Sequence, residues 1–262
     1  MQKIKDVSYT MDLNIRMFLI VCPLLFIAAV IDAIGGGGGL ISLPAFLFAG
    51  LPPHMAVATN KLASSCGTSV VTFKLIKNKL VDFKLAVPSV IMAILGASLG
   101  AKISLLIPDK LFLRIMIFVL PVCAFLVLNK KIFHDNDDIE HFGIRTYIIV
   151  SIAAFVIGMY DGIYGPGTGT FLIIAFTVFA KMSMRQANGQ AKVINLTSNV
   201  TSLVVFILNR QVLVPLGIAA ALCNMAGGYV GANLAIKNGS KITKPCILLV
   251  LTILLIKIII EA

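Results

Sequence analysis

The chain carries little charge for its length. Aspartate, glutamate, lysine and arginine make up 13% of its 262 residues, whereas soluble domains carry about 25%. Tryptophan is absent, and there are only three histidines. So few charges cannot cover a water-exposed surface of this size. We therefore exclude a soluble globular enzyme, a disordered protein and a nucleic-acid-binding domain.

Sequence motifs of reactive sites are also missing. No CxxC, HExxH or GK[ST] occurs in the chain, and no cysteines and histidines are grouped at metal-ligand spacing. The cysteines all lie inside apolar segments, where a thiol behaves as a small hydrophobic side chain. They are Cys22, Cys66, Cys123, Cys223 and Cys246. We expect no metal, no cofactor and no enzyme activity.

Hydrophobic residues dominate what is present. They form 59% of the chain, and its mean hydropathy is +1.01. They occur in runs of about 18–25 residues, long enough as helices to cross about 30 Å of hydrocarbon. This pattern predicts an all-α polytopic membrane protein. The predicted spans are 17–34, 54–76, 84–106, 111–129, 144–163, 185–208, 212–235 and 242–260.

Two further apolar runs, 40–51 and 170–180, are too short to cross comfortably. Each follows a glycine-rich break, which favours half-helices or re-entrant segments.

The excess of 22 basic over 11 acidic residues is concentrated in loops beside the apolar runs. Basic loops orient a membrane protein by the positive-inside rule, so we expect a lipid bilayer and no nucleic acid as the partner. The polar tail 1–16 precedes the first run without a convincing cleavage site. We therefore interpret that run as a retained span.

The two parts of the chain resemble each other. IDAIGGGGGL (31–40) aligns with YDGIYGPGTG (160–169), 129 positions later. Further on, ATNKL aligns with GQAKV, and GASLG with GGYVG, at 131 positions. Such order at a nearly fixed offset indicates a duplication. We divide the chain into a tail (1–16), a first repeat (17–129), a hydrophilic linker (130–143) and a second repeat (144–262).

Each repeat would hold four spans and one short helix. If the short runs complete a crossing, the odd number of segments inverts the second repeat. If they are re-entrant, the repeats are parallel. The distribution of basic residues among the loops leans toward inversion and leaves both arrangements open. GASLG and GGYVG are small-xxx-small patterns, which predict close helix contacts.

The glycine breaks could make an anion site. Each ends just before a short run, whose free N-terminal amides lie at the positive end of a helix dipole. Hydroxyls nearby, including that of Ser42, could add donors. Close helix packing or a simple kink is the structural alternative. The candidate binding residues here are Gly36, Gly37, Gly38, Gly39, Gly165, Gly167, Thr168, Gly169 and Thr170.

Two lysines, Lys61 and Lys192, lie about seven residues inside predicted spans. A charge at the membrane centre costs about 3 kcal/mol on insertion scales, so it needs a partner, a wet cavity or an anionic ligand. Snorkelling to the interface is the alternative. Polar neighbours extend this candidate substrate site: Thr59, Asn60, Gln190 and Asn195.

Nearly all acidic residues lie in tails or loops. The exceptions are Asp32 and Asp161, just ahead of the glycine breaks. A carboxylate at such a place could carry a coupling proton, or it could neutralise Lys61 or Lys192. Both interpretations stay open at this stage.

With these residues in view, the chain resembles the sulfite exporter TauE/SafE family, and within it the YfcA-type branch. The matching segments are IGGGGGLISLPAFL, LPPHMAVATNKLASSCGT, YDGIYGPGTGTF and QANGQAKVINLTSNVTSLVVFILNRQV. The resemblance implies a permease of the bacterial cytoplasmic (inner) membrane for small sulfur-containing or organic anions such as sulfite, sulfonates and sulfoacetate. It also implies roles for the glycine motifs and for Thr59, Asn60, Lys61 and Lys192. The first glycine run is longer than the family's usual pattern.

We therefore predict a secondary transporter of a small anion, working by alternating access and driven by a proton gradient. The anion would lie between the repeats, held by the half-helix ends and by Lys61 and Lys192. The alternatives are a cation carrier or channel using Asp32 and Asp161, or an intramembrane enzyme, for which we find no constellation. A homodimer is the assembly we consider, without a sequence signal for its interface.

Overall fold

The computed structural model describes residues 13–115, 119 and 142–238. Predicted spans 111–129 and 242–260, the tail 1–16 and the linker 130–143 lie wholly or mostly outside the described residues.

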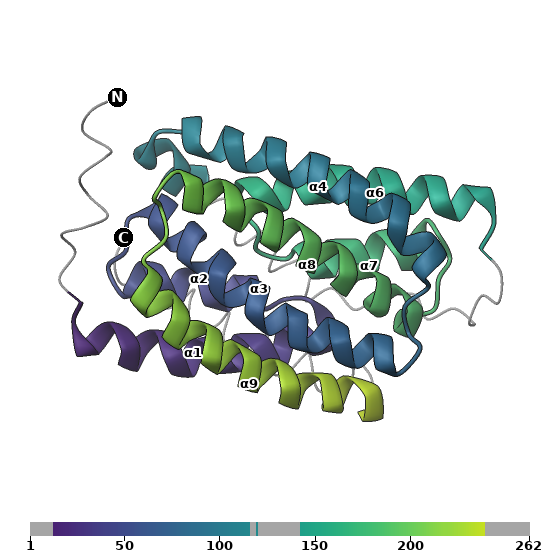
Figure 1. Cartoon of the computed structure of the whole chain (residues 1–262), viewed down its shortest axis with the longest axis horizontal. Coiled ribbons are helices and arrows are strands. Elements are labelled where there is room, and N and C mark those ends of the chain that lie inside the picture. The colour runs from purple at the N-terminus through teal and green to yellow at the C-terminus, as the bar shows by residue number, and fades with distance from the viewer. Residues whose placement is uncertain (1–12, 116–118, 120–141, 239–262) are drawn as a thin grey trace.

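Within the described part, every regular element is an α-helix (Figure 1). The first half contains α1 (Ile15–Gly35), α2 (Gly39–Phe48), α3 (Pro53–Lys77) and α4 (Phe83–Leu106). The second half contains α6 (Ile144–Ile163), α7 (Thr168–Val178), α8 (Met184–Leu208) and α9 (Val214–Asn238). The predicted all-α class is confirmed.

Five of these helices are long and apolar enough to cross a membrane, namely α1, α4, α6, α8 and α9. Their outward faces carry large apolar side chains such as Leu19, Val87 and Ile152, each more than half exposed. Exposed apolar surface of this extent is suited to lipid. The chain is therefore a multi-pass membrane protein, and α2 and α7 are the two short apolar helices among the described residues.

Local sequence signals explain where several helices begin. Asp82 caps α4, because its carboxylate accepts a hydrogen bond from the Leu85 amide at 2.9 Å. Ser183 caps α8 in the same way through the Gln186 amide. Helix α3 instead begins with Pro53, whose missing N–H and fixed φ suit the first turn.

The two halves end their third helices with the same turn. Lys79 after α3 and Arg210 after α8 both have positive φ, 58° and 55°. The backbone bonds around them also match: Leu80 donates to Leu75, and Gln211 donates to Phe206. These residues stand 131 positions apart in sequence, so the duplication extends to backbone geometry.

The halves interleave rather than lying side by side as separate bodies. Helix α4 packs along α6, and α9 packs along α1. Gly96 of α4 lies against the Phe155 carbonyl, and Gly227 of α9 lies against the Phe26 carbonyl. A side chain at either glycine would collide with the neighbouring backbone. The close helix contacts predicted from GASLG and GGYVG are thus present, and both join one half to the other.

Candidate functional site

The two glycine breaks meet at the centre of the molecule. Gly36 has a φ of 82°, which favours glycine, and it packs directly on the backbone of Gly169. The Thr170 hydroxyl donates a hydrogen bond to the Gly35 carbonyl at 2.9 Å. A β-carbon at Gly36 or at Gly169 would clash with the opposite break. Each break therefore fixes the position of the other.

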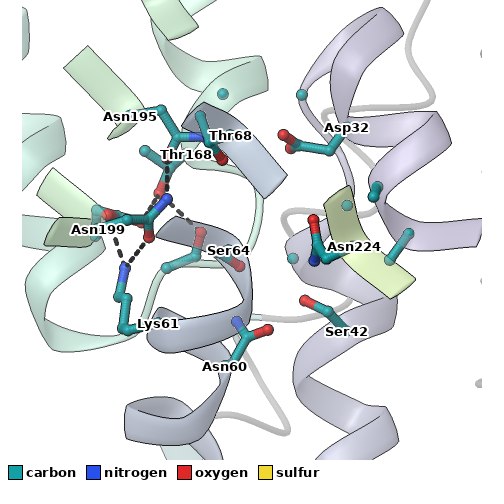
Figure 2. Close-up of a pocket in the computed structure, with 18 residues that line it drawn as sticks. Asp32, Ser42, Asn60, Lys61, Ser64, Thr68, Thr168, Asn195, Asn199 and Asn224 are labelled. Carbon is teal, nitrogen blue, oxygen red and sulfur yellow. Dashed lines mark hydrogen bonds and ion pairs between the residues drawn. The ribbon is translucent and has the colours of Figure 1, made fainter. Parts of the chain in front are cut away.

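A polar cavity of about 40 Å³ lies beside this crossing. It is lined from both halves, and Figure 2 shows two sides of it. Lys61, Asn195, Asn199 and Thr168 lie on one side, and Asp32, Ser42 and Asn224 lie on the other. Elements far apart in sequence thus supply one shared lining.

Both short helices begin at this cavity. Gly39 and Gly169, in the first turns of α2 and α7, belong to its lining. Among the described residues, their backbone amides have no hydrogen-bond acceptor. Free amides at the N-terminus of a helix, together with the positive end of its dipole, favour an anion.

Lys61 forms a fully enclosed ion pair with Asp161. Its Nζ lies 2.7 Å from Asp161 Oδ2, and both side chains are 2% exposed. The Thr168 hydroxyl donates to Asp161 Oδ1 at 2.8 Å, and the Ser198 hydroxyl donates to Oδ2 at 2.6 Å. Lys61 also donates to Asn199 Oδ1 at 2.9 Å. The carboxylate is thus held by three donors on three helices.

Lys192 forms the second ion pair, with Asp32 at 2.6 Å. The Lys192 side chain is fully buried, but the Asp32 side chain is 21% exposed and lines the cavity. Among the described residues, Lys192 is the sole hydrogen-bond partner of this carboxylate.

The pairing crosses the duplication in both directions. Lys61 of the first half binds Asp161 of the second, and Lys192 of the second half binds Asp32 of the first. Each buried lysine is therefore neutralised by the aspartate of the other repeat. An ion pair between the intramembrane lysines and aspartates is one of the two interpretations that the sequence left open.

The structure brings most of the predicted site residues to the cavity. Those in its lining are Asp32, Gly36, Gly38, Gly39, Asn60, Lys61, Asp161, Gly165, Thr168, Gly169 and Asn195. The lining does not include Gly37, Thr59, Gly167, Thr170, Gln190 or Lys192. Lys192 thus lies behind Asp32 and faces it rather than the cavity.

Thr59 and Gln190, which also lie outside the lining, have structural partners. Thr59 accepts a hydrogen bond from the Leu213 amide at 3.0 Å. Gln190 donates to the Asp82 carbonyl at 2.8 Å, between α8 and the start of α4. These contacts tie the halves together away from the cavity.

Sequence reasoning missed Ser198, Asn199 and Asn224. Asn195 and Asn199 are one helical turn apart on α8, and the Asn199 amide donates to Asn195 Oδ1 at 3.2 Å. Their spacing from Lys192 places them near one face of a helix, a signal that was available. Asn224 of α9 gave no such signal. It aligns with an apolar part of the first repeat, so the duplication does not mark it as a site residue.

Comparison with known proteins identifies the kind of chain this is. A family model described as "Sulfite exporter TauE/SafE" matches residues 21–258. A "Probable membrane transporter protein ORF9" of Sinorhizobium sp is 33% identical over 94% of each chain. A "Probable membrane transporter protein" of Haemophilus influenzae is 30% identical over 91% of this chain and 93% of its own. "Probable membrane transporter protein YfcA" of Escherichia coli is 29% identical over 90% and 87%. No solved structure matches the chain.

Proposed function

Since the chain belongs to the sulfite exporter TauE/SafE family of membrane transporters, we propose that it carries a small anion across the bacterial inner membrane by alternating access. We further propose that the anion is a sulfur-containing or organic one. The observation that supports this is the convergence of two helix N-termini and Lys61 on a single polar cavity between interleaved halves.

The charges around the cavity favour an anion over a cation. A cation carrier would need carboxylates free to replace water. Asp161 already binds Lys61, Thr168 and Ser198, and Asp32 binds Lys192. The free amides of α2 and α7 remain as the groups best placed to meet a ligand, and Lys61, which is paired with Asp161, lies in the cavity lining beside them.

We also propose that the two halves are inverted repeats. In Figure 1, α1 runs from left to right, and its counterpart α6 runs from right to left. A two-fold axis that exchanges the halves would turn the contact between α4 and α6 into the contact between α9 and α1, and both contacts are present. Rocking of inverted halves about a central site is a recurring route to alternating access. A proton gradient is the proposed driving force, with Asp32 and Asp161 as the candidate proton-coupling residues.

Flux into proteoliposomes tests the transport of anions. Purified protein would be reconstituted and supplied in turn with sulfite, sulfoacetate, methanesulfonate and, as the cation control, sodium. We expect uptake of at least one of the three anions and none of sodium. Lys61→Met should lower the anion flux by at least about tenfold, which corresponds to about 1.4 kcal/mol.

Lys74→Met on the same helix is the matched control. Lys74 lies over the Tyr229 ring near the end of α3, well away from the cavity lining. Its replacement should leave the flux unchanged. Sodium uptake, or a Lys61→Met protein that is monodisperse and transports at the wild-type rate, would refute the proposal.

A further inference from the structure

The charges of the site leave room for about one negative charge. Two lysines and two aspartates sum to zero when all are ionised. Each helix N-terminus contributes roughly half a positive charge, so the first turns of α2 and α7 together contribute about one. A doubly charged ligand would exceed this and leave an unmatched charge inside the bilayer, where it is costly.

The lining also contains unoccupied hydrogen-bond acceptors. Asp32 Oδ2 binds Lys192, whereas Oδ1 has no partner in the part of the chain that the structure describes. Asn60 is 8% exposed, and its Oδ1 is likewise unpartnered. Figure 2 shows Asp32 and Asn60 directed toward the space between the two sides of the cavity.

An unprotonated anion would fit poorly against these acceptors. Its oxygens would face the free carboxylate oxygen of Asp32 without a hydrogen atom between them, which is repulsive. A proton carried by the anion removes the repulsion and supplies the missing donor. Such a ligand combines acceptors for the helix amides and Lys61 with one donor for Asp32.

Asp161 cannot take this role without losing a contact. Its two oxygens already accept from Thr168, Ser198 and Lys61. The distinction between the two aspartates follows from sequence differences between the repeats. Gly39 and Gly67 stand in the first half where Thr168 and Ser198 stand in the second.

We infer that the site binds a dibasic oxyanion in its singly protonated form, with that proton lying between the anion and Asp32 Oδ1. This inference rests on the proposed anion transport. The proton enters and leaves with the anion, so each cycle moves one proton and one doubly charged anion, with a net charge of −1. No bond other than the shared hydrogen bond is made or broken.

Few other charges face Asp32. Lys192 approaches from α8, and Lys61 and Asp161 lie across the cavity. The described residues of α2, α7 and α9 contain no Asp, Glu, Lys or Arg up to Ile236. Of the titratable groups on α9, Cys223 contacts Cys22, and Tyr229 contacts Lys74. A pH response of ligand binding in this region therefore reports on the ligand, on Asp32, and on Lys192, Lys61 and Asp161.

Equilibrium binding to the purified full-length protein in nanodiscs tests the inference. Titration calorimetry would use sulfite at pH values on both sides of its second ionisation. Methanesulfonate, which is singly charged without a proton, and sulfate, which is doubly charged without one, are the comparison ligands. We expect the apparent sulfite affinity to fall about tenfold per pH unit above that ionisation. Methanesulfonate should bind on the order of tenfold more weakly than hydrogen sulfite at every pH, and sulfate should not bind.

Asp32→Asn should reverse this selectivity. The neutral amide leaves the Lys192 charge unmatched, so the site can accept a doubly charged anion. Sulfite binding should become independent of pH, and sulfate should bind. Asp109→Asn, which changes an exposed carboxylate beside His54, should keep the wild-type profile.

If Asp32→Asn does not fold, the wild-type ligand series decides alone. Sulfite binding that is equal on both sides of the ionisation, or sulfate binding as tight as hydrogen sulfite, would overturn the inference and leave anion transport standing. Failure of all three anions to bind at any pH would also overturn the inference, and absence of uptake of every anion in the flux assay would overturn the proposed transport.

Discussion

The two halves place the same pair of charged residues at the centre, but they surround them differently. Asp161 in the second half is 2% exposed and accepts hydrogen bonds from Thr168 and Ser198 besides its lysine. Asp32 in the first half is 21% exposed and has Lys192 as its one described partner. A duplicated unit has thus produced one pair in which both side chains are buried and one pair whose aspartate is partly exposed.

This difference separates two tasks that a transporter site must combine. A buried ion pair with all its hydrogen bonds satisfied has one favoured geometry, because moving either partner exposes an unmatched charge. A pair with a single contact beside a cavity can exchange partners at lower cost. We therefore assign a holding role to Lys61–Asp161 and a ligand-responsive role to Lys192–Asp32.

The largest expected effect comes from breaking the enclosed pair. Asp161→Ala leaves Lys61 unmatched and removes the acceptor of two hydroxyls, so it should lower the free energy of unfolding by about 3–5 kcal/mol. Asp32→Ala also unpairs a lysine but removes no further hydrogen bond, and it should cost less. Thermal unfolding of both purified variants in one detergent measures the difference.

The matched double variant Lys61→Met with Asp161→Ala removes both charges together. It should recover part of the loss, since no unmatched charge remains. An Asp32→Ala protein less stable than Asp161→Ala would contradict the assignment of the enclosed pair to the second half.

A smaller effect should follow when the second half is made more like the first. Ser198→Ala removes one donor to Asp161 and leaves the ion pair in place. Hydrogen bonds to charged groups contribute about 1.5–3 kcal/mol, and Lys61 still binds the same oxygen at 2.7 Å. We therefore expect a loss of about 1–2 kcal/mol in unfolding free energy.

Thr197→Ala next to it provides the control. Among the described residues, the Thr197 hydroxyl bonds only the Val193 carbonyl of its own helix, at 2.9 Å. Its removal should change the unfolding free energy by less than about 0.5 kcal/mol. Equal losses for the two variants would show that the Ser198 hydroxyl contributes nothing specific to the pair.

The helices themselves were predictable from sequence because lipid imposes a simple rule. An apolar run of sufficient length bounded by polar residues has to become a helix. The predicted run 84–106 is the helix Phe83–Leu106, and the predicted run 144–163 is Ile144–Ile163. The predicted run 54–76 is also a helix, Pro53–Lys77, but it is not among the helices apolar enough to span a membrane. Chain ends and the linker fall outside the described residues, so their predictions stay predictions.

The site was predictable only as a set of residues. Sequence alignment of the halves placed Lys61 opposite Lys192 and Asp32 opposite Asp161, which suggested equal roles. Which lysine meets which aspartate depends on how the halves interleave, and no local pattern encodes that. The exclusion of Lys192 from the cavity has the same origin, because a small rotation of α8 decides what a side chain faces.

The last comparison concerns the direction of the halves and should leave stability unchanged. Asn78 after α3 and Asn209 after α8 occupy matching turns, and both are exposed. If the halves are inverted repeats, these turns lie on opposite sides of the membrane. Single cysteines at Asn78→Cys and Asn209→Cys, in a background without the five native cysteines, would be labelled with a membrane-impermeant maleimide. In intact cells one position should react and the other only after the membrane is opened. Labelling of both positions from the same side would establish parallel repeats, related by an axis along the membrane normal, and would refute the proposed inversion.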